Sequence, residues 1–297
     1  MTQRVFSATR SSLQDEAEAL SSALPPLLVE AERLASAVSL GIHGRRKAGM
    51  GESFWQFRRF RAEDPSTAID WRQSAKSQHL FVREREWEVA QSVWFWRDGS
   101  PGMGFASGKV SKRDRASLLA LALASALVRG GERVALFGEG HAPASSRAAL
   151  RRMAYALGDA RMGEALPSEG PMSRNAQFVW LSDFLSPMAA VETRLRRMTQ
   201  SGLSGHLVHI IDPAEEDFPF EGRTRFEAPG QGLHETLGRA ESVAPAYRAR
   251  FRAHAEAVAA LAGKLGWTYL AHRTDRPPQT ALIALYAEMS GASRSRI

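Results

Sequence analysis

The sequence predicts an α/β fold in which a mostly parallel, doubly wound sheet carries an N-terminal helical segment and a small β-rich appendage. The main observation is that five short apolar runs alternate with five helical segments over the last two thirds of the chain. Alternation of strand and helix is typical of a parallel sheet covered by helices. Composition agrees, because 44% hydrophobic and 24% charged residues in 297 positions are ordinary for a globular protein with a sizeable core.

The elements of the α/β part follow from their periodicity. Short apolar runs bounded by turn residues predict strands at 92–96, 134–137, 178–181, 207–211 and 267–271. Apolar positions three or four residues apart predict helices at 118–128, 148–157, 191–198, 247–265 and 280–289.

The N-terminal part differs in composition. Residues 11–39 have helical spacing, and Pro25 and Pro26 divide them because proline is tolerated only in the first turn of a helix. A glycine-rich basic loop is expected at 41–51, followed by a β-rich insert at 52–89. We therefore expect a helical segment at 1–40, a basic β-rich block at 41–90 and the α/β domain at 91–297.

Several functional classes are disfavoured by composition. The chain has no cysteine, which excludes disulfides, thiolate catalysis and cysteine-bound zinc. It shows no secretory signal and no apolar stretch of membrane-spanning length, so a cytoplasmic location is expected, with peripheral contact at the inner membrane left open. The net charge of +7 is compatible with an acidic partner, but no nucleic-acid-reading motif accompanies it, so nucleic acid is not the expected partner.

Candidate site residues follow the strands. Asp98, Asp183 and Asp212 each stand directly after an apolar run. Ligands of open parallel sheets bind at the carboxyl ends of the strands, which makes these aspartates the first candidates. The alternative is that they are ordinary helix caps or turn residues.

Residues 97–103, Arg-Asp-Gly-Ser-Pro-Gly-Met, approach three motifs. A nucleophile elbow needs a glycine two residues before Ser100, where Asp98 stands. A phosphate-binding loop needs four residues between its glycines, whereas five separate Gly102 from Gly108. The third motif, the Asp-x-Ser-x-Ser pattern of metal-ion-dependent adhesion sites, fits Asp98 and Ser100 but has Gly102 in place of the last serine.

This degraded pattern predicts a weakened or absent site for Mg²⁺ or Mn²⁺, held by Asp98, Ser100 and Asp183 through hard oxygen ligands. In the alternative interpretation, Asp98 and Ser100 only satisfy backbone amides at the start of the next helix.

Other titratable residues carry weaker signals. His234-Glu235 lacks a second histidine at zinc-binding spacing, because Gly238 stands there. His209, inside an apolar run, is expected to be a hydrogen-bonded core residue. The acidic residues 215–217 are expected to form a solvated turn.

The basic block alternates arginines with aromatic residues. If it were a strand, aromatic side chains would lie on one face and most guanidinium groups on the other. Exposed ion pairs contribute only about 0.2–1 kcal/mol each, so stability is a weak reason for so many arginines. We therefore expect an acidic partner surface to be bound by Arg58, Arg59, Arg61, Trp71 and Arg72; the alternative is internal pairing with Asp64 and Asp70.

This block resembles the signature of the bacterial domain-of-unknown-function family number fifty-eight. The resemblance rests on 57–61, Phe-Arg-Arg-Phe-Arg, on 69–72, Ile-Asp-Trp-Arg, and on 82–84, Val-Arg-Glu, and it continues at Asp98, at 182–184 and at 212–216. It implies a von Willebrand factor A-like domain and a cytoplasmic protein commonly encoded beside a MoxR-type AAA+ ATPase and membrane-anchored von Willebrand factor A proteins. Gly102 departs from the intact adhesion motif, and no threonine ligand is evident between Gly138 and Asn175.

The expected function is therefore a non-enzymatic protein-binding or assembly factor with those partners and a degenerate adhesion site. Two alternatives remain open from the sequence. One is a hydrolase that uses Ser100 or a metal held by Asp98 and Asp183, and the other is an electrostatic nucleic-acid binder, whose affinity would fall steeply with salt.

Overall fold

The computed structural model describes residues 26–43, 54–61, 64, 66–77, 79–85, 90–159, 163–170, 172–230 and 232–292. The chain forms two compact units, Met1–Ile42 with Gln91–Ile297, and His43–Ala90. We call the first the α/β unit and the second the signature unit.

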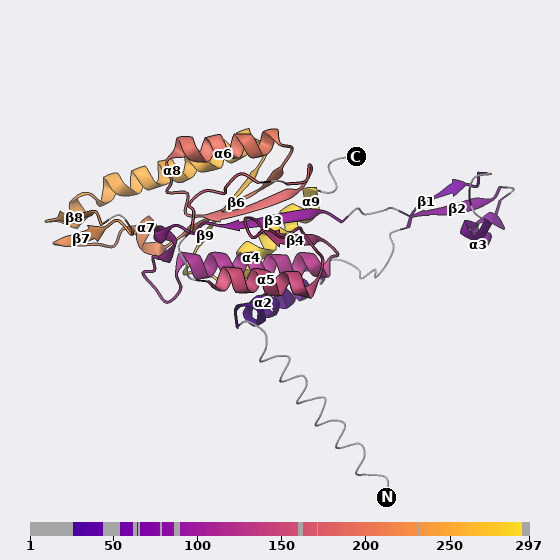
Figure 1. Cartoon of the computed structure of the whole chain (residues 1–297), viewed down its shortest axis with the longest axis horizontal. Coiled ribbons are helices and arrows are strands. Elements are labelled where there is room, and N and C mark those ends of the chain that lie inside the picture. The colour runs from indigo at the N-terminus through magenta and orange to yellow at the C-terminus, as the bar shows by residue number, and fades with distance from the viewer. Residues whose placement is uncertain are drawn as a thin grey trace, which may run out of the picture. The chain divides into compact units, whose positions relative to one another are not determined.

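The α/β unit is built on one sheet of five strands in the order β4-β3-β5-β6-β9, and its four pairings are all parallel (Figure 1). The strands are β3 (Ser92–Arg97), β4 (Arg133–Leu136), β5 (Gln177–Ser182), β6 (Ser204–Ile211) and β9 (Thr268–Arg273). Each of the five predicted strands is confirmed, with ends shifted by at most three residues. The fold is therefore a mixed α/β fold with a parallel central sheet flanked by helices.

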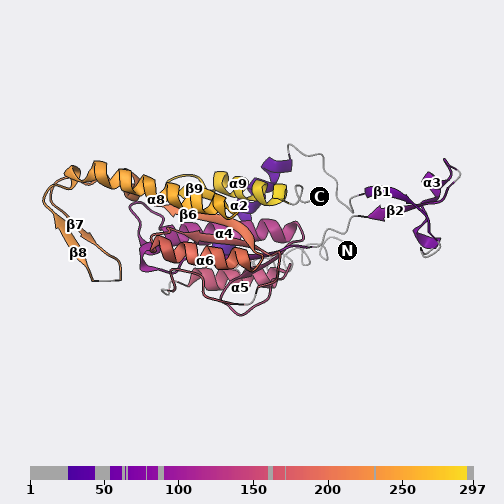
Figure 2. The same cartoon turned by 90° about the horizontal axis from the view of Figure 1, so that it is seen from above.

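Helices cover both faces of this sheet (Figures 1 and 2). The helices are α2 (Pro26–His43), α4 (Lys112–Arg129), α5 (Arg147–Gly158), α6 (Met188–Gln200), α8 (Ala244–Lys264) and α9 (Pro278–Ala292). Side chains of α2, α4, α5 and α9 pack in one apolar cluster and those of α6 and α8 in another. All five predicted helices of the α/β part are confirmed.

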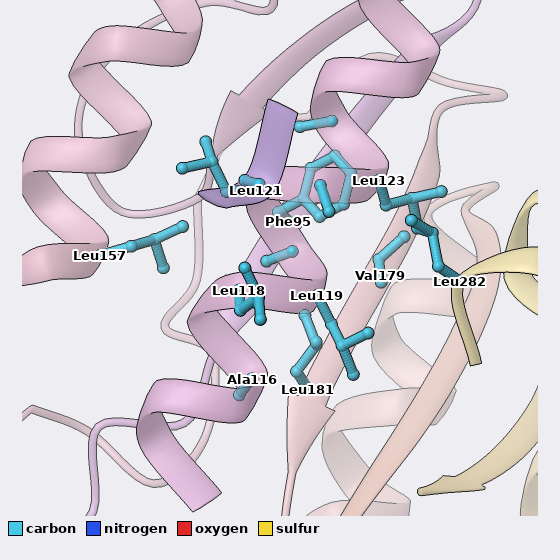
Figure 3. Packing of buried hydrophobic residues seen from close by; sticks show 14 of the residues in the cluster. Phe95, Ala116, Leu118, Leu119, Leu121, Leu123, Leu157, Val179, Leu181 and Leu282 are labelled. Atoms are coloured by element: carbon cyan, nitrogen blue, oxygen red, sulfur yellow. The ribbon is translucent and has the colours of Figure 1, made fainter. Parts of the chain in front are cut away.

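Helix α4 is the centre of the first cluster. Its sequence from Leu118 to Leu127 is apolar on every side, as expected of a helix that is covered all round. Leu119 and Leu123 lie with Phe95 and Val179 of the sheet, while neighbouring helices close over the other sides (Figure 3).

The N-terminal helix belongs to the same unit as the sheet. Helix α2 buries Leu28, Ala31 and Val38 against α4, and Arg129 of α4 donates to Ser36 Oγ at 2.9 Å. Its described residues run from Pro26 to His43, beyond the expected loop start at residue 41. The expected first piece of this helix lies outside the described residues.

Two further elements were not predicted. Helix α7 (Pro213–Asp217) follows β6 directly, where a solvated turn was expected. A two-stranded hairpin of β7 (Thr224–Glu227) and β8 (His234–Leu237) follows it. Phe218, Phe220, Phe226 and Tyr247 form an aromatic cluster at its base.

The signature unit pairs β1 (Phe54–Arg59) with β2 (Phe81–Arg85) in antiparallel fashion around helix α3 (Trp71–Ser74). The strand geometry considered for the basic block does not extend to Trp71 and Arg72, which lie in helix α3. Asp70 caps α3 by accepting a hydrogen bond from the Gln73 amide at 2.9 Å, which starts a helical turn at Trp71.

Candidate functional site

The carboxyl edge of the sheet gathers the predicted aspartates. Asp98 follows β3, Asp183 follows β5 and Asp212 follows β6, and these three strands are neighbours in the sheet. All three residues are buried, with exposures of 1%, 3% and 0%. Parallel strands end on the same edge, so the order of strands brings these carboxylates together.

Asp98 is held by two hydrogen bonds at its carboxylate. Its Oδ1 accepts the amide of Ser100 at 2.7 Å, and its Oδ2 accepts the Ser182 hydroxyl at 2.6 Å. Burial and the charge of Asp183 raise the pKa of Asp98 to about 6, although these hydrogen bonds lower it. The carboxyl group therefore accepts a proton more readily than an exposed aspartate does.

Ser100 and Gly102 lie in the turn that follows. Ser100 precedes the short 3-10 helix η2 (Pro101–Gly104) without a side-chain cap to it. A Cβ atom on Gly102 would lie 3.2 Å from Asp183 Oδ2 and 4.0 Å from Ser100 Oγ. A side chain at position 102 would thus face Asp183.

The close approach of two backbone segments explains why residue 99 of this motif is glycine. Gly99 donates to the Glu164 carbonyl at 3.0 Å, and Gly163 donates to the Gly99 carbonyl at 2.8 Å. A Cβ atom on Gly99 would lie only 2.7 Å from the Cα of Gly163. Any larger residue would separate these two backbone segments.

A lysine that the sequence reasoning missed lies at the centre of the site. Lys112, the first residue of α4, is fully buried, and its Nζ lies 2.9 Å from Asp183 Oδ2. The same ammonium contacts Oε1 of Glu215. Burial alone lowers the pKa of Lys112, but the charges and hydrogen bonds of Asp183 and Glu215 outweigh it, and the net shift is upward. Lys112 is therefore a charged group among carboxylates.

Glu215 reaches Lys112 from α7. Asp212 and Glu215 form a capping box, in which Asp212 Oδ1 accepts the Ala214 amide and Glu215 Oε2 accepts the Asp212 amide. The other oxygen of Glu215 remains for Lys112. The expected solvated turn at 215–217 is thus wrong for Glu215, whose side chain is only 17% exposed. We call Asp98, Asp183, Glu215 and Lys112 the carboxylate cluster.

The residues of the predicted metal site do not fit a divalent cation. Each carboxylate oxygen of Asp98 and Asp183 already has an internal donor: Ser100 N, Ser182 Oγ, Leu185 N and Lys112 Nζ. An ammonium group 2.9 Å from Asp183 also repels a second positive charge in a buried setting. The structure brings Asp98, Ser100 and Asp183 together but places Lys112 with them.

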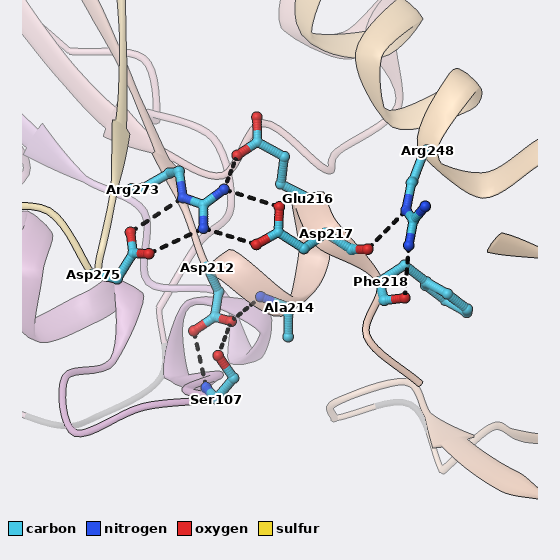
Figure 4. Close-up of polar contacts among 9 residues, drawn as sticks. All are labelled: Ser107, Asp212, Ala214, Glu216, Asp217, Phe218, Arg248, Arg273 and Asp275. Carbon is cyan, nitrogen blue, oxygen red and sulfur yellow. Dashed lines mark hydrogen bonds and ion pairs between the residues drawn. The ribbon is translucent and has the colours of Figure 1, made fainter. Parts of the chain in front are cut away.

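Asp212 takes a different role from the other strand-end aspartates. It accepts the Ser107 amide at 2.9 Å and the Ser107 hydroxyl at 2.5 Å, in addition to capping α7 (Figure 4). These contacts tie the loop before α4 to the end of β6. Asp212 is thus a helix cap, as the alternative interpretation of the strand-end aspartates expected.

A second ionic group lies beside α7. Arg273 at the end of β9 binds Glu216, Asp217 and Asp275, and both nitrogens of its guanidinium fork face Asp217 (Figure 4). Hydrogen bonds to Asp217 and Asp275 raise the pKa of Arg273, and the guanidinium lowers the pKa of Asp217 in return. This group fixes α7 to β9, and so holds Glu215 in place.

The buried histidines are structural. His209 is buried, and its Nδ1 lies 2.7 Å from the hydroxyl of Tyr269, which confirms the prediction of a hydrogen-bonded core residue. His206 pairs with Thr268 Oγ1 at 2.6 Å. Burial lowers the pKa of each to about 4, and that of His272 likewise. These rings stay neutral near pH 7.

The signature unit carries the other predicted site. Trp71 is 65% exposed, and Arg59, Arg61, Arg72 and Leu80 are exposed as well. Among the side chains of this unit that the structure describes, only Ser74 and Val82 are buried. The side chain of Arg58 lies outside the described set.

Asp64 and Asp70, which were the alternative internal partners of these arginines, also accept backbone hydrogen bonds. Asp64 Oδ2 accepts the Arg61 amide at 2.7 Å, and Asp70 caps α3. Both carboxylates thus stabilise backbone turns in this unit.

One sequence signal could have revealed Lys112. A lysine in the first turn of a helix opposes the helix dipole, so its presence there calls for a nearby carboxylate. Ser111 caps α4 by accepting the amide of Asp114, which fixes Lys112 at that first position. The partners themselves lie 71 and 103 residues away in the chain, so no local pattern names them.

No helix in the described part of the chain has the length and apolar character needed to cross a bilayer. Comparison with curated proteins finds no significant match.

Solved structures that match include an aerotolerance-related membrane protein from Bacteroides fragilis NCTC 9343, with 14% identity and a TM-score of 0.41, and the conserved hypothetical protein BatB from Bacteroides thetaiotaomicron, with 12% and 0.40. Each match covers 68% of this chain and 100% of the other. The profile of the family described as "Protein of unknown function DUF58" matches residues 56–258, and the chain therefore belongs to the DUF58 family.

Proposed function

We propose that this protein is a non-enzymatic binding and assembly factor whose signature unit docks on an acidic surface of a partner protein. The observation that supports this most directly is the 65% exposure of the Trp71 side chain. Tryptophan and arginine are enriched at the energetic centres of protein interfaces. A two-stranded sheet is marginally stable alone in water, so burial against a partner surface would stabilise it.

The charge of the surface indicates the kind of partner. Arg59, Arg61 and Arg72 are exposed on the same unit as Trp71, and the chain carries a net charge of +7. Arginine forks pair with carboxylates in two parallel hydrogen bonds, which favours an acidic partner. The proposed partners are a MoxR-type AAA+ ATPase and membrane-anchored von Willebrand factor A proteins, and peripheral contact with the inner membrane would follow from the latter.

The arrangement of the α/β unit supports binding over hydrolysis. The carboxylate next to Ser100 already accepts the Ser182 hydroxyl and the Ser100 amide. The ring nitrogens Nδ1 of the buried His206 and His209 pair with the hydroxyls of Thr268 and Tyr269. We accordingly propose a von Willebrand factor A-like scaffold that works without an enzymatic reaction and without a metal ion.

The test is binding of the full-length protein to the MoxR-type ATPase encoded nearest to its gene, measured by biolayer interferometry. Trp71→Ala and Arg72→Glu are each expected to weaken binding at least about tenfold, as the loss of an interface anchor does. Tyr155→Ala is the matched control, because Tyr155 is a 63% exposed aromatic residue on the α/β unit. Equal affinity for all variants would contradict the proposal.

A further inference from the structure

The carboxylate cluster contains more negative than positive charge. Asp98, Asp183 and Glu215 come from three strand ends, and Lys112 is the cation bound to the last two. Two of these carboxylates are less than 4% exposed. Several buried carboxylates at one point require a compensating cation, because burial of unpaired charge costs several kcal/mol.

The ammonium group of Lys112 contacts Asp183, one of the three residues of the predicted metal site. Its Nζ lies 2.9 Å from Asp183 Oδ2, and a Cβ atom on Gly102 would lie 3.2 Å from the same oxygen. A serine at 102 would therefore present its hydroxyl beside the atom that Lys112 now holds. Position 102, where the motif's last serine is missing, and Lys112 therefore lie next to the same atom, Oδ2 of Asp183.

The remaining contacts of Lys112 keep its ammonium in this position. Its side chain is fully buried, and Nζ also lies 6.0 Å from the centre of the Phe105 ring. Its backbone amide donates to the Phe105 carbonyl at 3.2 Å. Ser111 caps the helix one residue earlier, so the first turn of α4 is fixed from both sides.

We infer that Lys112 is a built-in cation that takes the place of the divalent ion at the carboxyl edge of the sheet. The ammonium joins the end of β5 to α7 and the start of α4, so the edge has one arrangement whether or not Mg²⁺ or Mn²⁺ is present. Gly102 and Lys112 are two departures from a cation-binding site that meet at one atom, Oδ2 of Asp183. With serine at 102 and a short side chain at 112, the introduced hydroxyl and the freed oxygens of Asp183 and Glu215 would lie beside the space that the ammonium leaves.

The experiment compares Mn²⁺ binding by full-length variants, using calorimetry and the electron paramagnetic resonance signal of free Mn²⁺. The wild type is expected to bind no Mn²⁺ specifically. The double variant Gly102→Ser with Lys112→Ala is expected to bind one Mn²⁺ ion per chain in a saturable manner. Adding Asp183→Asn to the double variant is expected to remove that binding.

Gly102→Ser with Lys109→Ala is the matched control, because Lys109 is an exposed lysine three residues away. It is expected to behave as the wild type. A folded double variant that binds Mn²⁺ no better than this control would overturn the inference.

A second measurement does not depend on the folding of any lysine variant. The melting temperature of the wild type is recorded with and without millimolar Mg²⁺ or Mn²⁺, and no change is expected. Saturable stabilisation of the wild type that Asp98→Ala abolishes would overturn the inference, since the ion would then bind with Lys112 in place.

Discussion

The ammonium group of Lys112 lies 2.9 Å from Oδ2 of Asp183, and neither side chain is more than 5% exposed. A buried ion pair of this kind contributes little net stability compared with an apolar pair, because both ions lose their hydration. Removal of one partner is different, since the other charge is left uncompensated in the interior.

We therefore expect Lys112→Met to lower the free energy of unfolding by about 3–5 kcal/mol. The measurement is urea denaturation monitored by circular dichroism. Lys109→Met, which removes an exposed lysine from the adjacent loop, is expected to change the stability by less than about 0.5 kcal/mol. Similar losses in the two variants would mean that the pair is not the cause.

Asp98 provides a prediction in the opposite direction. Its pKa of about 6 lies above the value near 3.9 of an unfolded aspartate, so the folded state disfavours the ionised form. The free-energy cost of burying the ionised Asp98 is absent below the unfolded pKa. It grows as the pH rises from the unfolded to the folded pKa, and it is complete above about pH 6.

Asp98→Asn should remove this cost while the introduced asparagine still accepts the Ser100 amide. We expect the variant to gain about 1–3 kcal/mol relative to the wild type at pH 7.5 and little at pH 4. Denaturation at both pH values measures the difference. The exposed Glu139→Gln is the control, and a gain that is the same at both pH values would disagree with the proposed ionisation.

The buried histidines predict a loss of stability in acid. His206, His209 and His272 have pKa values lowered to about 4 by burial, against about 6.5 in an unfolded chain. The contribution of these neutral histidines to the free energy of unfolding is fully present above pH 6.5. It is lost as the pH falls toward 4, because the unfolded state takes up protons first.

Between pH 7 and pH 5 the free energy of unfolding is expected to fall by about 1–2 kcal/mol for each of these histidines, partly opposed by Asp98. The double variant His206→Gln with His209→Gln should show a flatter pH dependence, whatever its absolute stability. His141→Gln, at an exposed position, should leave the slope unchanged. An unaltered slope in the double variant would show that other groups take up the protons.

The turn of the β7–β8 hairpin supplies a prediction about local structure. Gly230 has a φ of +76°, and a Cβ atom there would lie 2.6 Å from Pro101 Cγ. Both features disfavour any other residue, and a left-handed conformation alone costs roughly 1–2 kcal/mol for an L-residue.

Gly230→Ala is therefore expected to move the turn away from Pro101 and to speed amide hydrogen exchange in 224–237. Gly238→Ala is the matched control, because Gly238 lies beside the same hairpin, has no positive φ and would place its added methyl group more than 4 Å from any neighbour. Equal exchange rates in the two variants would indicate that the contact with Pro101 does not hold the hairpin.

The sequence by itself determined the α/β architecture of this protein. Short apolar runs and the 3.6-residue period record which residues are buried, and this local information placed all five strands and the five following helices. It also placed Asp98 and Asp183 at strand ends, since a turn residue after an apolar run marks the point where a strand leaves the core.

Only the tertiary structure decided what those residues contact. Lys112 and Glu215 are 103 positions apart, and their pairing depends on the order of strands and on the short helix α7. The alternation of aromatic residues and arginines around Trp71 did not indicate a helix, yet the Asp70 cap starts a helical turn there. Local patterns encode burial, whereas the partner of a buried charge is fixed by elements that meet only when the chain folds.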